Sequence, residues 1–408
     1  MIPTLHFSEF QESWLPSVLG DIAKFSKGKG LSKSELDPDG KISCVRYGEL
    51  YTRYGETISQ PISKTNTNIT KLVLSEANDV IIPASGETQI DIATASCIMT
   101  DGVALGGDLN IIKTSHDGVF LSYYLNSKRK HDIARLSQGI SVVHLYASQL
   151  ARLTLRIPSL REQQKIAAFL SAVDKKIQLL QLKKKLLGQY KKGAMQKIFS
   201  QEIRFKDEDG NDYPDWEERQ LRDMDIYIAD GNYGELYPKS DEMKSEGVPF
   251  IRANNIKDLQ LVWDDMKFID EKLHMTLKSG HLKFDDVLVT TRGEIGMVAY
   301  VDKPFEYANI NAQICLLRCG PSVSSYFLLQ YLHSAGGKKQ FKRYETGSAL
   351  KQLPKKSLGT IKIPVPRIDE QTLIADFLKT IDGKLLSIRK QIAVVIQFKK
   401  GLLQQMFV

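Results

Sequence analysis

The 408-residue chain is poor in cysteine, and no run of apolar residues approaches the roughly 18 needed to cross a membrane. Its four cysteines are too few and too scattered for a disulfide scaffold, which fits a reducing cytoplasm. The segment Met1–Trp14 lacks the basic-then-apolar pattern of a secretion signal. Hydrophobic residues make up 42% and charged residues 25%, ordinary values that exclude a mainly disordered or low-complexity chain. We expect a cytoplasmic protein without a membrane span.

Recognisable catalytic motifs are also missing from the sequence. Lys27-Gly28-Lys29-Gly30 has the composition of a phosphate-binding loop but not its spacing, and it is better interpreted as a flexible turn. Cys315 and Cys319 have no second Cys or His pair at metal-ligand distance along the chain, so we expect buried thiols there and not zinc. The seven histidines form no H-E-x-x-H arrangement, and no N-P-P-Y or D-P-P-Y segment is present. We therefore predict a binding protein that is not an enzyme and holds no metal or cofactor.

Positive charge is concentrated in one segment. The net charge is +8, and residues 156–206 alone contain 13 Lys and Arg against 3 Asp and Glu. Such a segment is typical of a protein attracted to nucleic acid or to another acidic surface. The same lysines could equally solvate the surface of a helix.

The sequence repeats itself. Glu162–Phe199 aligns with Glu370–Phe407 at a constant offset of 208, and fourteen of the 38 aligned pairs are identical, where chance gives about two or three. Upstream, Trp14 corresponds to Trp216 when small changes of offset are allowed, as loops would produce. Each half is therefore a variable block of about 155 residues followed by a better preserved block of about 45.

The variable blocks have the pattern of mixed α/β domains. Short β-branched runs at Asp79–Pro83 and Val287–Thr291 lie between Gly, Asn, Asp and Pro residues, which predicts strands and turns. Tyr123–Asn126 and Phe327–His333 are predicted as short helices. The pattern does not define the strand order.

The preserved blocks are predicted to be long helices. Ser159 and Glu162 have the spacing of a capping box, in which both side chains satisfy amides of the first turn. Apolar residues then recur in steps of four and three, interrupted at Lys184, which indicates a coiled-coil seam. Gly188 and Gly193 could bend or interrupt the first helix. The predicted seam comprises Ile166, Leu170, Val173, Ile177, Leu180, Leu187, Ile374, Leu378, Ile381, Leu385, Ile388, Ile392 and Val395.

Two copies of one unit tend to pack about a pseudo-twofold axis, which makes the two helices antiparallel with one variable block at each end. The predicted fold class is α+β, with two mixed α/β domains joined by two long antiparallel coiled-coil helices. The predicted domains are 1–157 and 201–363 for the variable blocks, and 158–200 and 364–408 for the helices.

At the start of each predicted helix, Ile-Pro is followed by Glu-Gln and then by a Phe-Leu pair. This layout resembles the specificity subunit of type I restriction-modification systems. The match lies in Ile157–Leu170 and in Ile363-Pro364 with Glu370–Leu378, and it covers essentially the whole chain. Trp14 and Trp216 fit as well. Thr291–Gly296 fits a strand-turn of the second recognition domain, whereas the first copy differs and reads Ala84-Ser85-Gly86-Glu87.

The resemblance implies that each variable block is a target recognition domain for one half of a bipartite double-stranded DNA site. It also implies docking of two modification subunits, which bind S-adenosylmethionine and methylate adenine N6, and of restriction subunits that use ATP and Mg²⁺. Because the two blocks differ in sequence, the half-sites should differ too. Two such blocks read one DNA face best when the half-site centres lie about 34 Å apart.

Basic, aromatic and amide side chains of the variable blocks are the candidate DNA contacts, because Lys and Arg bind phosphates and Arg and Asn can read base edges. Three alternatives stay open: a strand with an aromatic core face around Arg46–Tyr54, a turn at Asn254-Asn255, and a solvated helix end at Lys338–Arg343. The candidates are Lys27, Lys29, Lys33, Arg46, Tyr47, Arg53, Tyr54, Asn232, Tyr233, Arg252, Asn254, Arg292, Lys338, Lys339, Lys342 and Arg343.

Other readings of the sequence are compatible with the duplication. The chain could be the specificity partner of a fused methylase-nuclease of the type IIB kind, or a two-headed scaffold for protein partners. A third possibility is an enzyme with an unrecognised site where the halves join. Salt-sensitive binding to duplex DNA separates a DNA-binding subunit from a protein scaffold.

Overall fold

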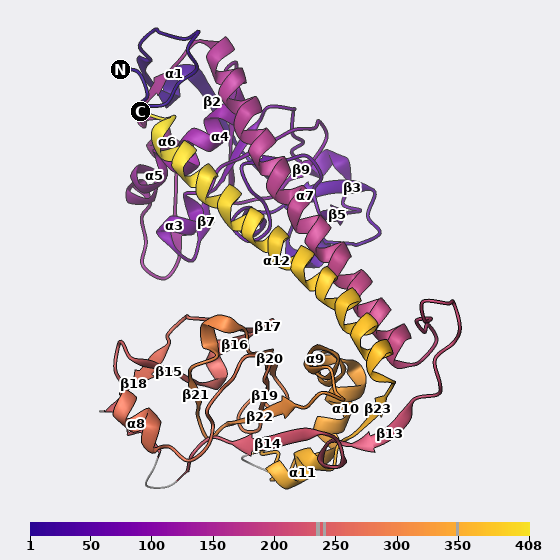
Figure 1. Ribbon diagram of the computed structural model, residues 1–408. Coiled ribbons are helices and arrows are strands. Elements are labelled where there is room, and N and C mark those ends of the chain that lie inside the picture. Colours follow the sequence, from indigo (N-terminus) through magenta and orange to yellow (C-terminus); the bar gives the residue numbers. More distant parts are fainter. Residues whose placement is uncertain (234–236, 240–241, 348–350) are drawn as a thin grey trace. The chain divides into compact units, whose positions relative to one another are not determined.

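The computed structural model describes residues 1–233, 237–239, 242–347 and 351–408. The chain divides into two units, one made of Met1–Gln181 and Lys390–Val408, the other of Leu182–Arg389. The two long helices, α7 (Leu160–Phe199) and α12 (Ile368–Gln405), each contribute one half to each unit (Figure 1). No helix within the described ranges combines the length and apolarity needed to cross a membrane.

The first unit has a five-stranded sheet of order β2-β10-β6-β8-β4, a three-stranded sheet β5-β3-β9, and the pairs β1-β12 and β11-β7. Its strands are β1 Leu15–Val18, β2 Ala23–Lys27, β3 Ile42–Val45, β4 Thr57–Ile58, β5 Ser63–Thr65, β6 Val80–Pro83, β7 Ser85–Gly86, β8 Ser96–Ile98, β9 Ala104–Leu105, β10 Leu109–Thr114, β11 Val143–His144 and β12 Thr154–Ile157. Its shorter helices are α1 Leu19–Ile22, α2 Tyr47–Leu50, α3 Gln89–Ile92, α4 Gly118–Ser127, α5 Lys130–Leu136 and α6 Ala147–Leu150.

The second unit has a six-stranded sheet of order β14-β22-β19-β20-β17-β16, a three-stranded sheet β18-β15-β21, and the pair β13-β23. Its strands are β13 Glu217–Gln220, β14 Ile226–Asp230, β15 Val248–Ile251, β16 Ile256–Lys257, β17 Leu259–Leu261, β18 Lys267–Ile269, β19 Val287–Thr290, β20 Val298–Tyr300, β21 Asn309–Ile310, β22 Ile314–Cys319 and β23 Lys362–Val365. Its shorter helices are α8 Glu271–Thr276, α9 Ser325–His333, α10 Ala335–Tyr344 and α11 Lys355–Gly359.

The predicted strands at Asp79–Pro83 and Val287–Thr291 are confirmed as β6 and β19, and each is buried on both faces. Successive side chains of a strand point to opposite faces. Val80 and Ile82 therefore enter the core beneath α4, whereas Ile81 enters a second core on the other face. In β19, Val287 and Val289 likewise enter one core, whereas Leu288 enters a second core on the other face. Burial on both faces explains why these runs are continuously apolar.

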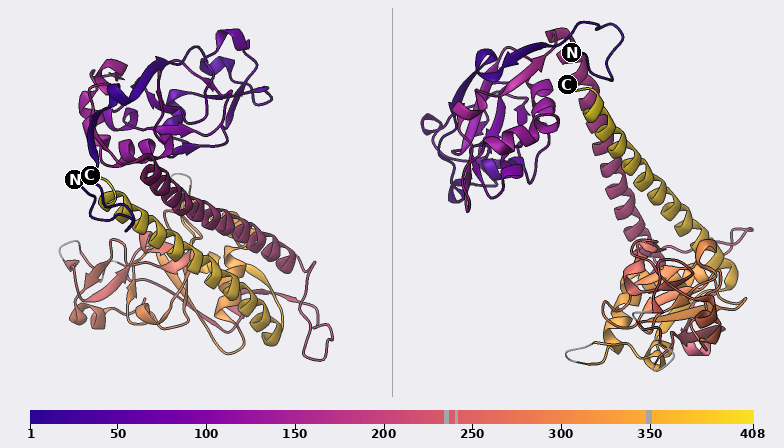
Figure 2. Two further views of the ribbon diagram at one scale, coloured as in Figure 1. Left: turned by 90° about the horizontal axis from the view of Figure 1, so that it is seen from above. Right: turned by 90° about the vertical axis from the view of Figure 1, so that its left-hand side faces the viewer.

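The predicted short helices are also confirmed, as α4 and α9. Each presents an aromatic side chain to the tryptophan near the start of its own variable block: Trp14 packs edge-on against Phe120 of α4, and Trp216 against Phe327 of α9. In the first unit Phe407 of the C-terminal segment stacks on Tyr124 with ring centroids 5.4 Å apart. Both chain ends thus lie in the first unit, where the Leu5 amide donates to the Gln405 carbonyl (Figure 2).

Two expectations about the first helix are wrong. The backbone amide of Glu162 donates to Ser159 Oγ at 3.3 Å, but the buried Glu162 carboxylate accepts from the Trp14 indole Nε1 at 3.0 Å and does not close a capping box. An indole N–H buried beside a carboxylate has no better acceptor. Gly188 and Gly193 do not interrupt α7, which runs unbroken to Phe199.

The two long helices lie side by side and run in opposite directions in both units (Figures 1 and 2). All thirteen predicted seam residues are buried or half-buried. In the first unit Leu170 and Val173 share a core with Leu402, and in the second Leu378 and Ile381 share one with Met195. The fold is thus a duplicated pair of α/β domains joined by antiparallel helices.

The seam continues past Leu187 and Val395 onto lysines. The next positions in steps of four are Lys191 and Lys399. Lys191 Nζ lies 2.7 Å from Asp382 Oδ1 in the second unit, and Lys399 Nζ lies 2.8 Å from Asp174 Oδ1 in the first. Lys399 also pairs with Glu56 at 3.1 Å. A seam defined by apolar residues alone ends one step before these lysines.

Candidate nucleic-acid interface

A basic and an aromatic side chain lie together at one edge of the large sheet in the second unit. β14 and β19 both pair antiparallel with β22, so their C-terminal ends lie at the same edge. Tyr233 follows β14 and Arg292 follows β19, and the Arg292 guanidinium lies over the Tyr233 ring at 5.1 Å from its centroid. The Tyr233 hydroxyl donates to the Ala312 carbonyl at 3.1 Å. Both Tyr233 and Arg292 are exposed to solvent.

The first unit has a corresponding edge. β2 and β6 both pair antiparallel with β10, so Lys27 at the end of β2 and Ser85 just after β6 lie at one edge. β11 pairs with β7 there, and the chain continues to Tyr146. Lys27 Nζ lies 6.0 Å from the Tyr146 ring centroid, and Tyr146 stacks with His144. The cation at this edge therefore comes from Lys27, where the second unit uses Arg292.

Sequence reasoning did not identify Tyr146, nor the hairpin that precedes it. Gln138 and His144 form a β-bridge, as do Thr346 and Gln352, their partners at the offset of 208. At the tip of the first hairpin Ile140 is 98% exposed. Residues 348–350 lie outside the described part of the chain.

Other predicted residues of the first unit are spread over several elements. Lys29 and Lys33 are exposed, and so is Arg53. Tyr47 and Tyr54 are half-buried and pack against the core beside β3 and β6. This segment forms the short helix α2 and not a strand, so the alternative of a strand with an aromatic face is wrong. Arg46 stands just before the helix, and its amide donates to the Glu49 carboxylate at 2.9 Å.

The structure brings Arg252 and Asn254 together at Asp265. Arg252 Nη2 and Asn254 Nδ2 lie 2.9 and 3.2 Å from Asp265 Oδ2. The Arg252 guanidinium lowers the pKa of this carboxyl, chiefly by hydrogen bonding. Ala253–Asn255 is a 3₁₀ turn, which confirms the predicted turn. Asn232 is buried and donates to the Ser279 carbonyl at 2.6 Å, so its amide is already engaged within the protein.

The predicted basic cluster lies on one helix. In α10 the buried Phe341 faces the core, and the exposed side of the helix carries the positive charge. Arg343 lies over the Tyr344 ring at 5.7 Å. This arrangement could bind phosphates and is also that of a solvated helix. The exposed basic residues of α10 are Lys338, Lys339, Lys342 and Arg343.

The cysteines and acidic groups serve as parts of the fold. Cys315 is buried and its thiol donates to Asp230 Oδ1 at 2.6 Å, and burial raises the pKa of this thiol. Burial likewise raises the pKa of Tyr233, and the nearby Asp230 adds to the effect, so the phenol stays protonated and can donate a hydrogen bond. Within the described residues no group of three or more His, Cys, Asp or Glu side chains could hold a metal ion.

Comparison with known proteins identifies the family. The family model for the type I restriction modification DNA specificity domain matches the chain twice, over residues 11–188 and 213–397. The chain belongs to this family of type I specificity domains. Its two matches coincide with the two halves of the repeat, so each half of the chain is one such specificity domain.

Similar specificity subunits cover nearly the whole chain. The MjaVIII type I restriction enzyme specificity subunit of Methanocaldococcus jannaschii is 25% identical and covers 98% of this chain and 93% of its own. The putative MjaX specificity subunit of the same organism is 26% identical, with 97% and 93% covered. The type I specificity subunit from M. genitalium has the same fold, with a TM-score of 0.67, 18% identity and coverage of 100% and 99%.

Proposed function

We propose that the chain is the DNA-reading subunit of a type I restriction-modification complex, in which each unit recognises one half of an asymmetric two-part duplex site. The proposed recognition domains are 1–157 and 201–363, and the helices 158–200 and 364–408 hold them together. The observation that carries the proposal is the matching sheet edge of the two units. Lys27 with Tyr146 and Arg292 with Tyr233 place a cation and an exposed aromatic ring at that edge.

This pairing suits DNA on physical grounds. A guanidinium can read guanine with two hydrogen bonds, and a lysine ammonium can bind guanine or phosphate. A tyrosine ring beneath the cation holds it in place and limits the entropy lost when it binds. Since one edge carries Lys27 and the other Arg292, the two half-sites should differ in sequence.

The proposed partners carry the chemistry. Two modification subunits with S-adenosylmethionine would methylate adenine, and restriction subunits would use ATP and Mg²⁺. This chain would contribute base recognition and docking surfaces, without a catalytic group or cofactor of its own. The complex would act in the cytoplasm, where the host DNA lies.

Mapping of methylated adenines tests the proposal. In cells that express the chain with its modification subunit, we expect methylation at a two-part motif with a fixed gap. Arg292→Ala should relax one position in one half of the motif and leave the other half unchanged. Methylation at a single continuous motif, or none that depends on this chain, would refute the proposal.

A further inference from the structure

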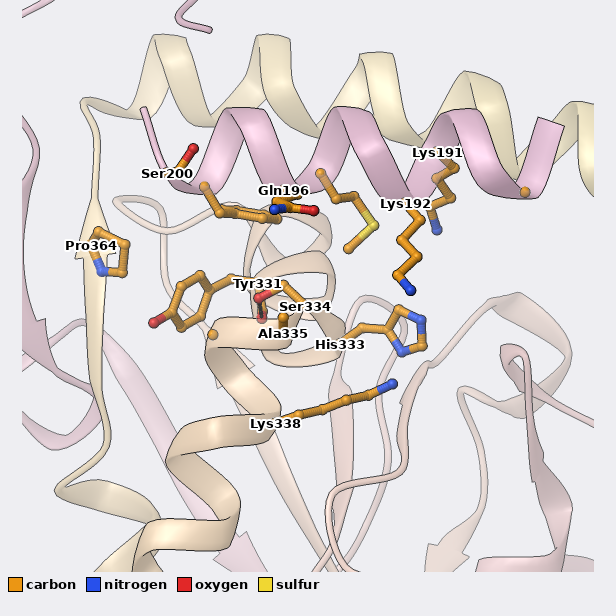
Figure 3. A pocket seen from close by; sticks show the side chains of 14 residues that line it. Lys191, Lys192, Gln196, Ser200, Tyr331, His333, Ser334, Ala335, Lys338 and Pro364 are labelled. Atoms are coloured by element: carbon orange, nitrogen blue, oxygen red, sulfur yellow. Dashed lines mark hydrogen bonds between the residues drawn. The ribbon is translucent and has the colours of Figure 1, made fainter. Parts of the chain in front are cut away.

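A cavity of about 630 Å³ lies in the second unit between α7 and the junction of α9 and α10 (Figure 3). Met195 and Phe199 of α7 form one apolar wall, and Tyr331 and Pro364 form another. The basic end of the cavity holds Lys191, Lys192 and Lys338 around His333. Figure 3 shows Lys192 and Lys338 pointing toward His333 from opposite sides. The cavity is therefore apolar at one end and cationic at the other.

The first unit contains the counterpart of this cavity, with a volume of about 530 Å³. Its α12 lining residues stand at the offset of 208 from those of α7: Lys399 replaces Lys191, Lys400 replaces Lys192, and Leu403 replaces Met195. Ser127 and Lys128, at the end of α4, occupy the place of Ser334 and the start of α10. Both repeats have thus kept a hollow at the same site, although their variable blocks have diverged.

The two cavities share an excess of positive charge. Among the residues that the structure describes, no Asp or Glu side chain lines either cavity. Lys191 and Lys399 are neutralised by the half-buried carboxylates of Asp382 and Asp174, but the exposed Lys192 and Lys400 have no acidic partner in the described part of the chain. Burial and the neighbouring Lys338 lower the pKa of His333 to about 4, so this imidazole is neutral at pH 7. The net charge at each hollow comes from lysines.

We propose that the two cavities dock two copies of one acidic partner segment, which inserts one or two large apolar side chains and pairs a carboxylate with Lys192 in one unit and with Lys400 in the other. The inference rests on the proposed function, in which the modification subunit is the partner present twice. A DNA backbone would pair with the lysines but would leave the concave wall of Met195, Phe199 and Tyr331 without an apolar partner. Matching lysines and an apolar residue at a constant offset favour one kind of occupant at both cavities, whereas the two DNA half-sites are expected to differ.

Charge reversal at each cavity gives a stoichiometric test. Lys192→Glu and Lys400→Glu would be made singly and together in the full chain, and the mass of its complex with the modification subunit would be measured by native mass spectrometry. We expect two bound copies for the unmodified chain, one for each single variant and none for the double variant at the same concentration. Lys176→Glu and Lys384→Glu are the matched controls, because these exposed lysines also stand 208 apart and line neither cavity.

Two results would overturn the inference. The double variant could keep two bound copies, or it could lose affinity for duplex DNA in the absence of partner while binding both copies, which would make the hollows DNA contacts. Circular dichroism of each variant checks that the fold is retained. A different result would refute the proposed function: the unmodified chain binds two modification subunits, but the complex methylates no two-part site.

Discussion

Lys191 and Asp382 form an ion pair inside the helix seam, with the Lys191 side chain 9% exposed. Tyr326 and Gln330 of α9 both donate to the same carboxylate, at 2.9 and 2.8 Å. Asp382 therefore joins three elements of the second unit: α7, α9 and α12. In the first unit Asp174 joins α12 through Lys399 and α4 through Tyr123. Polar pairs at seam positions fix which residues of two helices face each other.

Replacing one member of a seam ion pair should destabilise its unit. Lys191→Met leaves the half-buried Asp382 without a cation, at a cost of about 3 kcal/mol. Lys399→Met should cost more, because it leaves both Asp174 and Glu56 without their cation. Chemical denaturation of the full chain measures both. Lys191→Met combined with Asp382→Leu should recover much of the loss, and a double variant as unstable as the single one would contradict this account.

The two tryptophans should respond differently to removal of the indole N–H. Trp14→Phe leaves the buried Glu162 without its hydrogen-bond donor and should cost about 1–3 kcal/mol. Trp216→Phe should cost less, because Arg204 still donates to Glu370 at 2.8 Å. Thermal unfolding of the two variants compares them directly. Equal losses would mean that ring packing, and not the hydrogen bond, dominates.

The second unit should lose stability in mild acid because of His333. Its pKa is about 4 in the folded chain, below the ordinary 6.5, owing to burial and to Lys338 and Lys191; Asp382 and Asp258 oppose this shift. The unfolded chain therefore binds the proton first, so stability falls as the pH drops from about 6.5 toward 4. Unfolding measured across this range should be less pH-dependent in His333→Gln. If stability depends on pH equally in His333→Gln and in the unmodified chain, groups other than His333 cause the dependence.

Two arginines of the second unit should affect DNA binding in distinct ways. Arg343→Ala should weaken binding to all sequences and lower the dependence of log K on log salt by about one unit. Arg292→Ala should reduce discrimination at one base pair by about 1–3 kcal/mol if the contact is bidentate. Filter binding of single-base variants at several salt concentrations distinguishes the two. If Arg292→Ala lowers the affinity for all sequences equally, Arg292 contacts phosphate and not a base.

Glycines within the long helices should be replaceable by alanine. Gly193 and Gly401 occupy equivalent positions, and apart from the adjacent residues and the helix's own backbone no described heavy atom lies within 4 Å of the place a Cβ would take. Each change should stabilise the helix by about 0.5–1 kcal/mol, because alanine loses less entropy on folding. Chemical denaturation provides the measurement. A loss of stability would show that the helix needs the freedom of glycine there.

The sequence predicted the helices, their seam and the two-block plan because these depend on periodicity and on the repeat. It did not predict the Trp14–Glu162 hydrogen bond. The spacing of Ser159 and Glu162 is that of a cap, and a competing donor 148 positions away leaves no local signal. Nor did the sequence predict the ion pairs of Lys191 and Lys399 within the seam, because their partners Asp382 and Asp174 lie on the other helix.

The sequence distinguishes the candidate DNA contacts only by residue type and by the residues next to them in the chain. It could not separate Arg292, which lies over an exposed ring, from Arg252, which is held by Asp265. That difference comes from tertiary structure, since Asp265 approaches from a turn and Tyr233 from the segment that follows β14. Tyr146 was missed for the same reason, because β11 brings it to the edge that Lys27 occupies.

The core of the first unit includes Leu402, Met406 and Phe407, which follow the entire second unit in the chain. The first unit therefore cannot complete its core until residues 390–408 have been made. The usual order of co-translational folding, in which an N-terminal domain folds before the rest of the chain is made, does not apply to this unit.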